Sequence, residues 1–226
     1  MATLIACFHG GGSTGDIFKI QCERLQAELE GEGIELVFFD GPFERDAGPG
    51  MQVFEDYGPF KSWFFTDALG NQTADGSGFD ESNTGGLQRV RRMLELRAPK
   101  DQWAGVMGFS QGTRVAAGLL LEQQQRINKG TNDGWNFGFG IFCNGGGAPM
   151  QSSPAEEPEL IKIPTLHVHG SKDFNLENGR KQKKGHFDED AATLMEINYH
   201  HAMPWTPKDL DQFAGLIKQL YHEAQK

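Results

Sequence analysis

The stretch Trp103-Ala-Gly-Val-Met-Gly-Phe-Ser-Gln-Gly-Thr-Arg-Val-Ala-Ala-Gly-Leu-Leu-Leu121 joins an apolar, strand-like run to a run with helical period. The pentapeptide Gly108-Phe-Ser-Gln-Gly112 lies at the junction, which puts Ser110 at the tip of a sharp strand-to-helix turn. Glycines two residues before and after the serine let the backbone turn without side-chain clashes. This is the context of a nucleophile elbow, in which a serine hydroxyl stands above the sheet and a helix N-terminus points at any oxyanion formed there.

A second glycine-rich turn, His9-Gly10-Gly11-Gly12, follows the first apolar run. It has the form of the H-G-G-G turn of esterases, whose backbone N–H groups stabilise a tetrahedral intermediate together with the N–H of the residue after the nucleophile. The expected oxyanion donors are therefore the N–H groups of Gly11 or Gly12 and of Gln111.

Apolar runs at regular intervals indicate the fold class. They alternate with longer segments of helical period and cover residues 3–8, 34–39, 103–109, 137–143, 163–169 and 193–199. This order predicts an α/β fold with a mostly parallel sheet of about six strands and helices on both faces. Helices are expected over residues 16–30 and 85–97, and from the cap Thr206 and Pro207 to Leu220.

The length of 226 residues suits a single domain spanning residues 1–226. Residues 40–84 are rich in Gly, Pro, Asp and aromatic side chains and are too long for a simple connection. Long structured loops in compact domains often bind ligands or cover a site, so this segment is predicted to be a lid-like insertion.

Composition narrows the classes of partner and compartment. The 21 Lys and Arg against 31 Asp and Glu give a net charge of −10, which repels nucleic acids and anionic membranes. The three cysteines form no C-x-x-C pair, and the first residues lack the pattern of a signal peptide. No apolar run approaches the ~20 residues of a membrane span. We therefore expect a cytoplasmic protein with no nucleic-acid or membrane partner.

A serine nucleophile needs a histidine to take its proton and a carboxylate to orient that histidine. In α/β-hydrolases these partners follow in the order serine, acid, histidine. Asp173 comes just after the predicted strand 163–169, and His201 follows the next predicted strand. The alternative for Asp173 is a helix cap, and His200 competes with His201 for the role of base.

Short motifs spread along nearly the whole chain point to one family. They are Cys7-Phe-His-Gly10 followed by Gly15-Asp-Ile-Phe18, Phe39-Asp-Gly-Pro42, Ser62-Trp-Phe64, Gly108-Phe-Ser-Gln-Gly112, His169-Gly-Ser-Lys-Asp173 and His201-Ala-Met-Pro204. In these motifs the sequence resembles the fungal and eukaryotic serine hydrolases of the FSH type, which include thioesterases that release polyketide chains. The family's last motif is similar to Gly-Gly-His-x-Val-Pro, a spacing that selects His201, although Tyr199 and His200 replace the glycines.

The resemblance implies an α/β-hydrolase that cleaves an ester or thioester through a triad of Ser110, Asp173 and His201. It also implies that aromatic residues of the segment 57–65 line the acyl pocket, namely Phe60, Trp63 and Phe64. The implied substrate is a polyketide-type acyl chain of secondary metabolism, carried on an acyl carrier protein and released by hydrolysis or lactonisation. No cofactor is implied.

Two related readings stay open. The carboxylesterases and acyl-protein thioesterases share the Gly-Phe-Ser-Gln-Gly elbow, but the motifs 39–42 and 201–204 favour the FSH type. A binding protein on a hydrolase fold is a further alternative, since a fold alone does not prove activity. The complete set of triad residues argues against it.

A more distant reading is an NAD-dependent reductase. The run Gly10–Gly15 satisfies G-x-G-x-x-G, and Asp40 closes the second strand, where a ribose-binding acid belongs. However, the reductase pair Tyr57 and Lys61 encloses Gly58-Pro59, which excludes the required helix. A P-loop fails because Asp16 replaces its lysine.

Two histidines raise the question of a metal site. His167 and His169 lie on one face of a predicted strand and could begin such a site. Without a third ligand at suitable spacing, no metal is expected.

Overall fold

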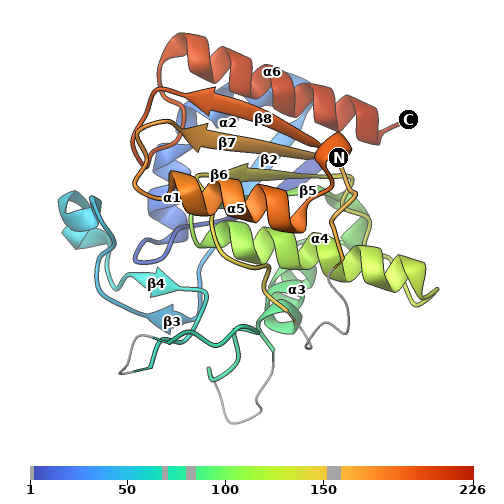
Figure 1. Ribbon diagram of the computed structural model, residues 1–226, viewed down its shortest axis with the longest axis horizontal. Coiled ribbons are helices and arrows are strands. Elements are labelled where there is room, and N and C mark those ends of the chain that lie inside the picture. The colour runs from blue at the N-terminus through green and yellow to red at the C-terminus, as the bar shows by residue number, and fades with distance from the viewer. Residues whose placement is uncertain (1–2, 68–70, 80–84, 152–158) are drawn as a thin grey trace.

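The computed structural model describes residues 3–67, 71–79, 85–151 and 159–226. Its centre is a parallel sheet of six strands in the order β2-β1-β5-β6-β7-β8, which confirms the predicted fold class (Figure 1). The strands are β1 (Thr3–Phe8), β2 (Ile34–Phe39), β5 (Trp103–Phe109), β6 (Phe139–Cys143), β7 (Thr165–Gly170) and β8 (Ala192–Ile197). They start and end close to the bounds of the predicted apolar runs.

Helices cover both faces of the sheet (Figure 1). One face carries α1 (Gly15–Gln21), α2 (Glu23–Leu29) and α6 (Pro207–Ala224), and the other carries α3 (Gly86–Arg97), α4 (Gly112–Asn128) and α5 (Leu176–His186). The short elements are η1 (Glu30–Glu32), η2 (Met51–Tyr57), η3 (Lys100–Gln102), η4 (Glu189–Ala191), β3 (Phe43–Glu44) and β4 (Lys61–Ser62). Covering both faces lets a parallel sheet bury the continuous apolar runs that its strands carry.

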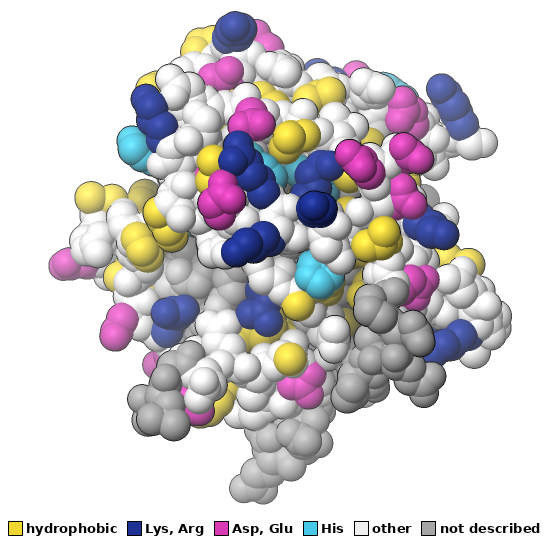
Figure 2. Space-filling model, in the orientation of Figure 1, with side chains coloured by type: hydrophobic (Ala, Val, Ile, Leu, Met, Phe, Trp, Pro, Cys, Tyr) yellow, Lys and Arg dark blue, Asp and Glu magenta, His cyan; other side chains and the backbone are white. Residues whose placement is uncertain are grey.

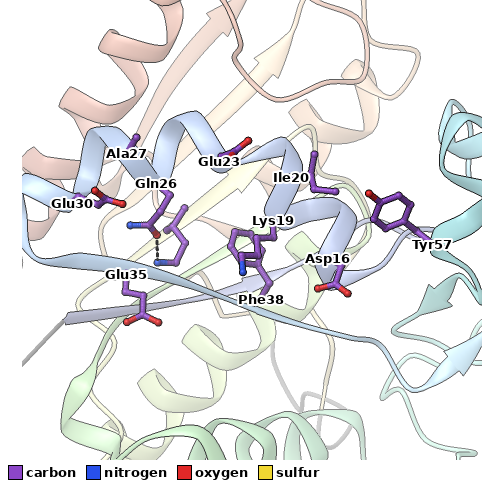
Figure 3. A pocket seen from close by; sticks show the side chains of 11 residues that line it. Asp16, Lys19, Ile20, Glu23, Gln26, Ala27, Glu30, Glu35, Phe38 and Tyr57 are labelled. Atoms are coloured by element: carbon purple, nitrogen blue, oxygen red, sulfur yellow. Dashed lines mark hydrogen bonds between the residues drawn. The ribbon is translucent and has the colours of Figure 1, made fainter.

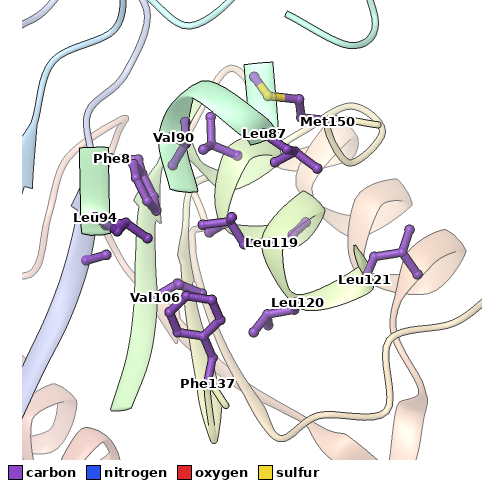
Figure 4. Close-up of a cluster of buried hydrophobic side chains, with 14 of the residues drawn as sticks. Phe8, Leu87, Val90, Leu94, Val106, Leu119, Leu120, Leu121, Phe137 and Met150 are labelled. Carbon is purple, nitrogen blue, oxygen red and sulfur yellow. The ribbon is translucent and has the colours of Figure 1, made fainter. Parts of the chain in front are cut away.

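Successive side chains of β1 point to opposite faces and divide the core into two clusters. Leu4, Ala6 and Phe8 belong to the cluster that α3 and α4 cover, part of which Figure 4 shows. Ile5 and Cys7 belong to the cluster beneath α1, α2 and α6. This follows from the two-residue period of an extended strand.

The predicted helices agree with the structure in part. Residues 86–97 and 207–224 are helical, and Thr206 caps the last helix, since the Asp209 N–H donates to its Oγ1 at 3.4 Å. The expected helix over residues 16–30 is divided at the buried Cys22, which lies between α1 and α2. The sequence analysis did not single out α5, because the residues that this helix buries are Gly179 and Gln182 rather than an apolar stripe.

The segment 40–84 packs against the glycine-rich turn after β1. The Gly12 N–H donates to the Lys61 carbonyl, and the Lys61 N–H donates to the Ser13 carbonyl, both at 2.8 Å. The Gly48 N–H in turn donates to the Gly12 carbonyl at 2.8 Å. Positions 68–70 and 80–84 of this predicted insertion lie outside the described residues. Its lid function stays a prediction.

The outer edge of β2 is occupied by a side chain of α2. The Leu36 N–H donates to Gln26 Oε1 at 2.7 Å, and Gln26 Nε2 donates to the Ile34 carbonyl at 3.0 Å. The amide therefore takes the place of a neighbouring strand at these two groups, which blunts the edge against pairing with other chains. Within the described ranges, no helix combines the length and apolar character that crossing a bilayer requires.

Candidate active site

Ser110 lies on the turn between β5 and α4 in a backbone conformation that is uncommon for a residue with a side chain. Its φ is +49°, in the left-handed region. Two hydrogen bonds hold the turn: the Ser110 N–H donates to the Cys143 carbonyl at 2.9 Å, and the Thr113 hydroxyl donates to the Ser110 carbonyl at 2.6 Å. Strained backbone of this kind is found at functional sites when the surroundings hold it in place.

The two glycines of the elbow are required by close backbone contacts. A Cβ at Gly108 would lie 2.5 Å from the Gly112 carbonyl carbon, and a Cβ at Gly112 would lie 2.0 Å from the Phe8 carbonyl oxygen. Both distances are far inside van der Waals contact. Gly112 therefore packs directly on the end of β1, where any side chain would force the turn away from that strand, while a side chain at Gly108 would collide with the first turn of α4.

Asp173 and His201 are hydrogen-bonded to each other at the carboxyl edge of the sheet. Asp173 Oδ2 lies 2.8 Å from His201 Nδ1, and the Asn175 N–H donates to Asp173 Oδ1 at 2.8 Å. The Asp173 side chain is 1% exposed and that of His201 is 16% exposed. A carboxylate only accepts hydrogen bonds, so it assigns the proton of the neutral ring to Nδ1 and leaves the Nε2 lone pair free.

The imidazole of His201 lies beside the elbow. Its ring centroid is 4.9 Å from that of Phe109, the residue before Ser110, and 4.7 Å from that of Phe174. His200 points elsewhere, since its Nδ1 is 3.0 Å from the Lys172 carbonyl oxygen. The structure thus brings His201, rather than its neighbour, to both the acid and the serine turn.

The glycine-rich turn and the elbow each present one backbone N–H group that has no partner among the described residues. The Gly12 N–H donates to Lys61, whereas the N–H groups of Gly11 and Gln111 have no acceptor in the part of the chain that the structure describes. The Gln111 side chain is anchored, because the Trp63 N–H donates to its Oε1 at 2.9 Å. Of the two donors expected on the first turn, Gly11 is therefore the one left available.

His9 is buried beneath this turn and holds it from the inside. Its Nδ1 is 2.7 Å from the Gly10 carbonyl oxygen, and its Nε2 accepts the Gly41 N–H at 2.9 Å. Burial lowers the pKa of His9 to about 4, so the ring is neutral at physiological pH. The His9 carbonyl accepts the indole N–H of Trp63 at 2.9 Å. The sequence analysis did not assign this positioning role.

The expected pocket residues are largely in the core. Trp63 and Phe64 are 1% and 0% exposed; Trp63 packs edge-on against Phe8, and the Arg114 guanidinium lies 3.8 Å from the centroid of the Phe64 ring. Phe60 is half-buried. In this conformation neither buried ring reaches the surface, because both complete the packing around β1. A substrate-binding role for Phe60, Trp63 and Phe64 stays a prediction.

Further cysteine and histidine side chains that could react or bind a metal lie in the interior, namely those of Cys7, Cys22, Cys143, His167 and His169. Cys7, Cys22 and Cys143 are free and buried, and burial raises the pKa of each thiol, which disfavours the reactive thiolate. His167 and His169 are buried in β7, and desolvation lowers the pKa of both. Among the residues that the structure describes, no group of three His, Cys, Asp or Glu side chains could hold a metal ion.

Two side chains that belong to the dinucleotide hypothesis are hydrogen-bonded within the fold. Asp40 Oδ1 accepts the Gly15 N–H at 2.7 Å, and Thr14 Oγ1 accepts the Ile17 N–H at 3.2 Å, so both act inside the first turn of α1. Tyr57 ends η2 and Lys61 begins β4, which places the proposed reductase pair on separate elements. The geometry therefore does not favour the reductase reading.

A groove of about 790 Å³ runs along α1, α2 and the outer side of β2, lined by side chains that include Lys19, Glu23 and Tyr57 (Figure 3). Tyr57, from the aromatic segment 57–65, lines it, whereas the candidate triad, Phe60, Trp63 and Phe64 do not. This groove and the Asp173–His201 pair therefore share no lining residue.

Folds with a serine elbow of this kind at the carboxyl edge of a parallel sheet form the class of α/β-hydrolases. A family model described as serine hydrolase (FSH1) matches residues 2–213, and the chain belongs to this family. The protein is therefore an enzyme of the serine hydrolase class, which confirms the resemblance seen in the motifs.

Several fungal esterases are similar over almost the full chain. Esterase pigG of Monascus ruber is 30% identical over 250 residues, covering 97% of this chain and 91% of its own. A probable esterase of Aspergillus terreus is 33% identical over 232 residues, covering 96% and 88%. Esterase mlcF of Penicillium citrinum is 30% identical over 230 residues, covering 98% and 91%. These names agree with an esterase activity.

Solved structures support the same fold. The acyl-protein thioesterase 2 of Zea mays superposes with a TM-score of 0.62 at 18% identity, covering 97% of this chain and 94% of that structure. The esterase PE8 gives a TM-score of 0.59 at 18% identity, covering 96% and 92%. At this identity the likeness establishes the fold alone.

Proposed function

We propose that this serine hydrolase cleaves a thioester or ester through an acyl-enzyme formed on Ser110. The observation that carries the proposal is the hydrogen bond between Asp173 and His201, at 2.8 Å, beside the serine elbow. His201 Nε2 takes the proton of the Ser110 hydroxyl as the oxygen attacks the carbonyl carbon, and then gives that proton to the departing thiol or alcohol. Asp173 keeps the ring in the required tautomer and stabilises the imidazolium.

In the second half-reaction His201 activates the acceptor that removes the acyl group from Ser110. Water as acceptor releases an acid, and a hydroxyl of the acyl chain itself releases a lactone. The N–H groups of Gly11 and Gln111 stabilise the oxyanion in both halves, each by about 3 kcal/mol. Their lack of any other partner in the described structure supports this assignment.

The proposed substrate is a polyketide-type acyl chain of secondary metabolism. The proposal is supported by the motifs shared with the FSH-type hydrolases, which include thioesterases that release such chains, and by the fungal esterases related to this protein. An exposed aromatic ring at the site also suits an apolar acyl group: Phe174 is 74% exposed and packs on His201.

An acyl carrier protein is the proposed donor of this chain. The helix α5 begins three residues after Asp173 and carries the exposed Lys181 and Lys184, within a chain of net charge −10. Figure 2 shows several Lys and Arg side chains over the region of α5. An acidic carrier domain would find complementary charge there. The double change Lys181→Glu and Lys184→Glu should therefore raise KM for a carrier-bound thioester but not for a free ester.

The alternative is a carboxylesterase or acyl-protein thioesterase activity, favoured by the shared Gly-Phe-Ser-Gln-Gly elbow. Rates on a panel of acyl thioesters and simple esters separate the two readings. We further propose a cytoplasmic location, which the three free thiols support because unpaired cysteines persist in reducing compartments.

The test of Ser110 is intact mass after treatment with a fluorophosphonate. The wild type and the control Ser171→Ala, a change at an exposed serine, should each gain one adduct, and Ser110→Ala should gain none. Turnover of Ser110→Ala should fall at least about a thousandfold. An adduct on Ser110→Ala, or near-normal turnover by it, would overturn the proposal.

A further inference from the structure

We infer that Asn144 is a positioning residue that holds the loops of Asp173 and His201 at a set place relative to Ser110. The inference rests on the function proposed above and adds to it a residue outside the predicted triad. Asn144 directly follows β6, which lies between the serine strand β5 and the acid strand β7.

The side chain of Asn144 bridges the two loops with one acceptor and one donor. Its Oδ1 accepts the Gly170 N–H at 2.8 Å, and its Nδ2 donates to the Ala202 carbonyl at 2.8 Å. Gly170 ends β7 three residues before Asp173, and Ala202 follows His201 directly. A single amide group thus contacts the backbone next to both members of the Asp–His pair.

The serine turn is attached to the adjoining residue. The Ser110 N–H donates to the Cys143 carbonyl at 2.9 Å, so all three segments of the candidate triad are hydrogen-bonded to Cys143 or Asn144. The two loops also bond to each other, through the Lys172 N–H and the Tyr199 carbonyl at 2.9 Å. That direct bond fixes the loop of the acid relative to the loop of the base. Asn144 fixes both loops relative to the serine turn.

The backbone at Asn144 is itself special. Its φ is +49° and the residue is 2% exposed. Asparagine tolerates the left-handed region better than most residues, and its short side chain has both a donor and an acceptor. Aspartate lacks the donor, serine can fill only one of the two contacts, and glycine keeps the backbone conformation but loses both contacts. Of these four small residues, only asparagine makes both contacts and also tolerates this backbone conformation.

Asn175 extends the same network to the acid. Its Nδ2 donates to the Gly145 carbonyl at 2.8 Å, while its own N–H donates to Asp173 Oδ1 at 2.8 Å. The residues after β6 are thus linked to the carboxylate by a second route. Displacement of catalytic groups by about 1 Å can cost a hundredfold in rate, so a loss of these links should reduce kcat more than it changes KM.

The test compares Asn144→Gly with a matched control, Gln123→Ala. Gln123 is likewise buried, at 4% exposure, and pairs with one N–H and one carbonyl, those of Phe137 at 2.7 and 3.0 Å. Phe137 precedes β6, at the end of the strand opposite Asn144. Both changes therefore remove two buried hydrogen bonds around one strand, and only Asn144→Gly removes them beside the site.

We expect Asn144→Gly to lower kcat by about a hundredfold with KM within about threefold, and to weaken the downfield proton signal of the His201 Nδ1–H. Gln123→Ala should keep both kcat and that signal, even if it unfolds at a lower temperature. Normal kcat in folded Asn144→Gly would overturn the inference, as would an equal loss of kcat in the control. Should Asn144→Gly not fold, Asn144→Ser, which can keep one of the two contacts, should lower kcat by about tenfold, and normal kcat in that variant would overturn the inference.

Failure of the Asn144 inference can be distinguished from failure of the proposed hydrolase function. If Ser110→Ala keeps its activity, the proposed function fails whatever Asn144 does. If Ser110→Ala is inactive and Asn144→Gly is fully active, only the positioning role of Asn144 fails.

Discussion

Asp173 and His201 are 28 residues apart in the chain, yet the carboxylate Oδ2 lies 2.8 Å from the imidazole Nδ1. They meet because they follow β7 and β8, which are neighbours in a parallel sheet and end at the same edge. The serine turn follows β5 at that edge as well.

Asp173→Asn should reduce kcat by about ten-thousandfold, because the amide would favour the wrong tautomer of the His201 ring. Steady-state hydrolysis of a short chromogenic ester measures the effect. Asp211→Asn, on an exposed position of α6, is the control and should keep wild-type rates. A loss smaller than about tenfold in Asp173→Asn would show that this carboxylate is not the acid of the triad.

Gly112→Ala should lower the free energy of unfolding by at least about 2 kcal/mol, since its Cβ would lie 2.0 Å from the Phe8 carbonyl oxygen. Thermal or urea unfolding followed by circular dichroism measures the change. Gly215→Ala is the matched control, because its Cβ would meet no atom within 4 Å and lies in the exposed face of α6. The control should gain up to about 1 kcal/mol. Equal behaviour of the two variants would contradict the close packing at the elbow.

The buried His9 should make stability fall as the pH is lowered. The folded protein keeps its pKa at about 4, below the ordinary value of 6.5, so the unfolded chain binds the proton first. Stability is therefore lost progressively as pH falls from about 6.5 toward 4, by about 2 kcal/mol between pH 7 and pH 5. Desolvation lowers the pKa of His167 and His169 and adds to the same trend.

Urea unfolding at pH 7 and pH 5 tests the contribution of His9. His9→Gln retains a donor and an acceptor without the titration, and should flatten the pH dependence by about 2 kcal/mol. The control Leu96→Ala, a change at an exposed position without a titratable group, should leave the dependence as in the wild type. An unchanged slope in His9→Gln would mean that His9 binds a proton equally well in both states.

Phe174→Ala should reduce kcat/KM about fivefold while leaving the unfolding temperature nearly unchanged. The ring contacts His201 at a centroid distance of 4.7 Å but is 74% exposed, so it contributes to the imidazole's surroundings more than to the core. Leu96→Ala, at an 80% exposed position of α3, serves as the control for loss of a surface apolar group. A wild-type kcat/KM in Phe174→Ala would exclude a role for this ring.

Much of the fold could be predicted because local patterns carry it. The apolar runs located every strand of the central sheet, and the cap at Thr206 located the last helix. The break at Cys22 was missed, since the apolar period continues through it. The helix α5 was missed because it packs through Gly179 and Gln182, which no hydrophobic pattern reveals.

The residue types and the order of the candidate site could be predicted from the sequence. The residues that hold the site in place could not. Ser110, Asp173 and His201 each follow a strand, which is visible in the sequence. The contacts of Asn144, His9 and Phe174 join residues far apart in the chain, and no local sequence pattern predicts them. The burial of Trp63 and Phe64 likewise depends on how the segment 40–84 folds back on β1.

The sequence by itself determined the alternation of strands and helices, the elbow with its two glycines, and the order of the candidate triad, because each depends on residues close together in the chain. Only the tertiary structure placed His201, rather than His200, against Asp173, gave the Gly12 N–H but not the Gly11 N–H an acceptor among the described residues, and joined three loops through Cys143 and Asn144. These outcomes depend on distances between strand ends, which are set when the sheet is assembled and its two cores are packed.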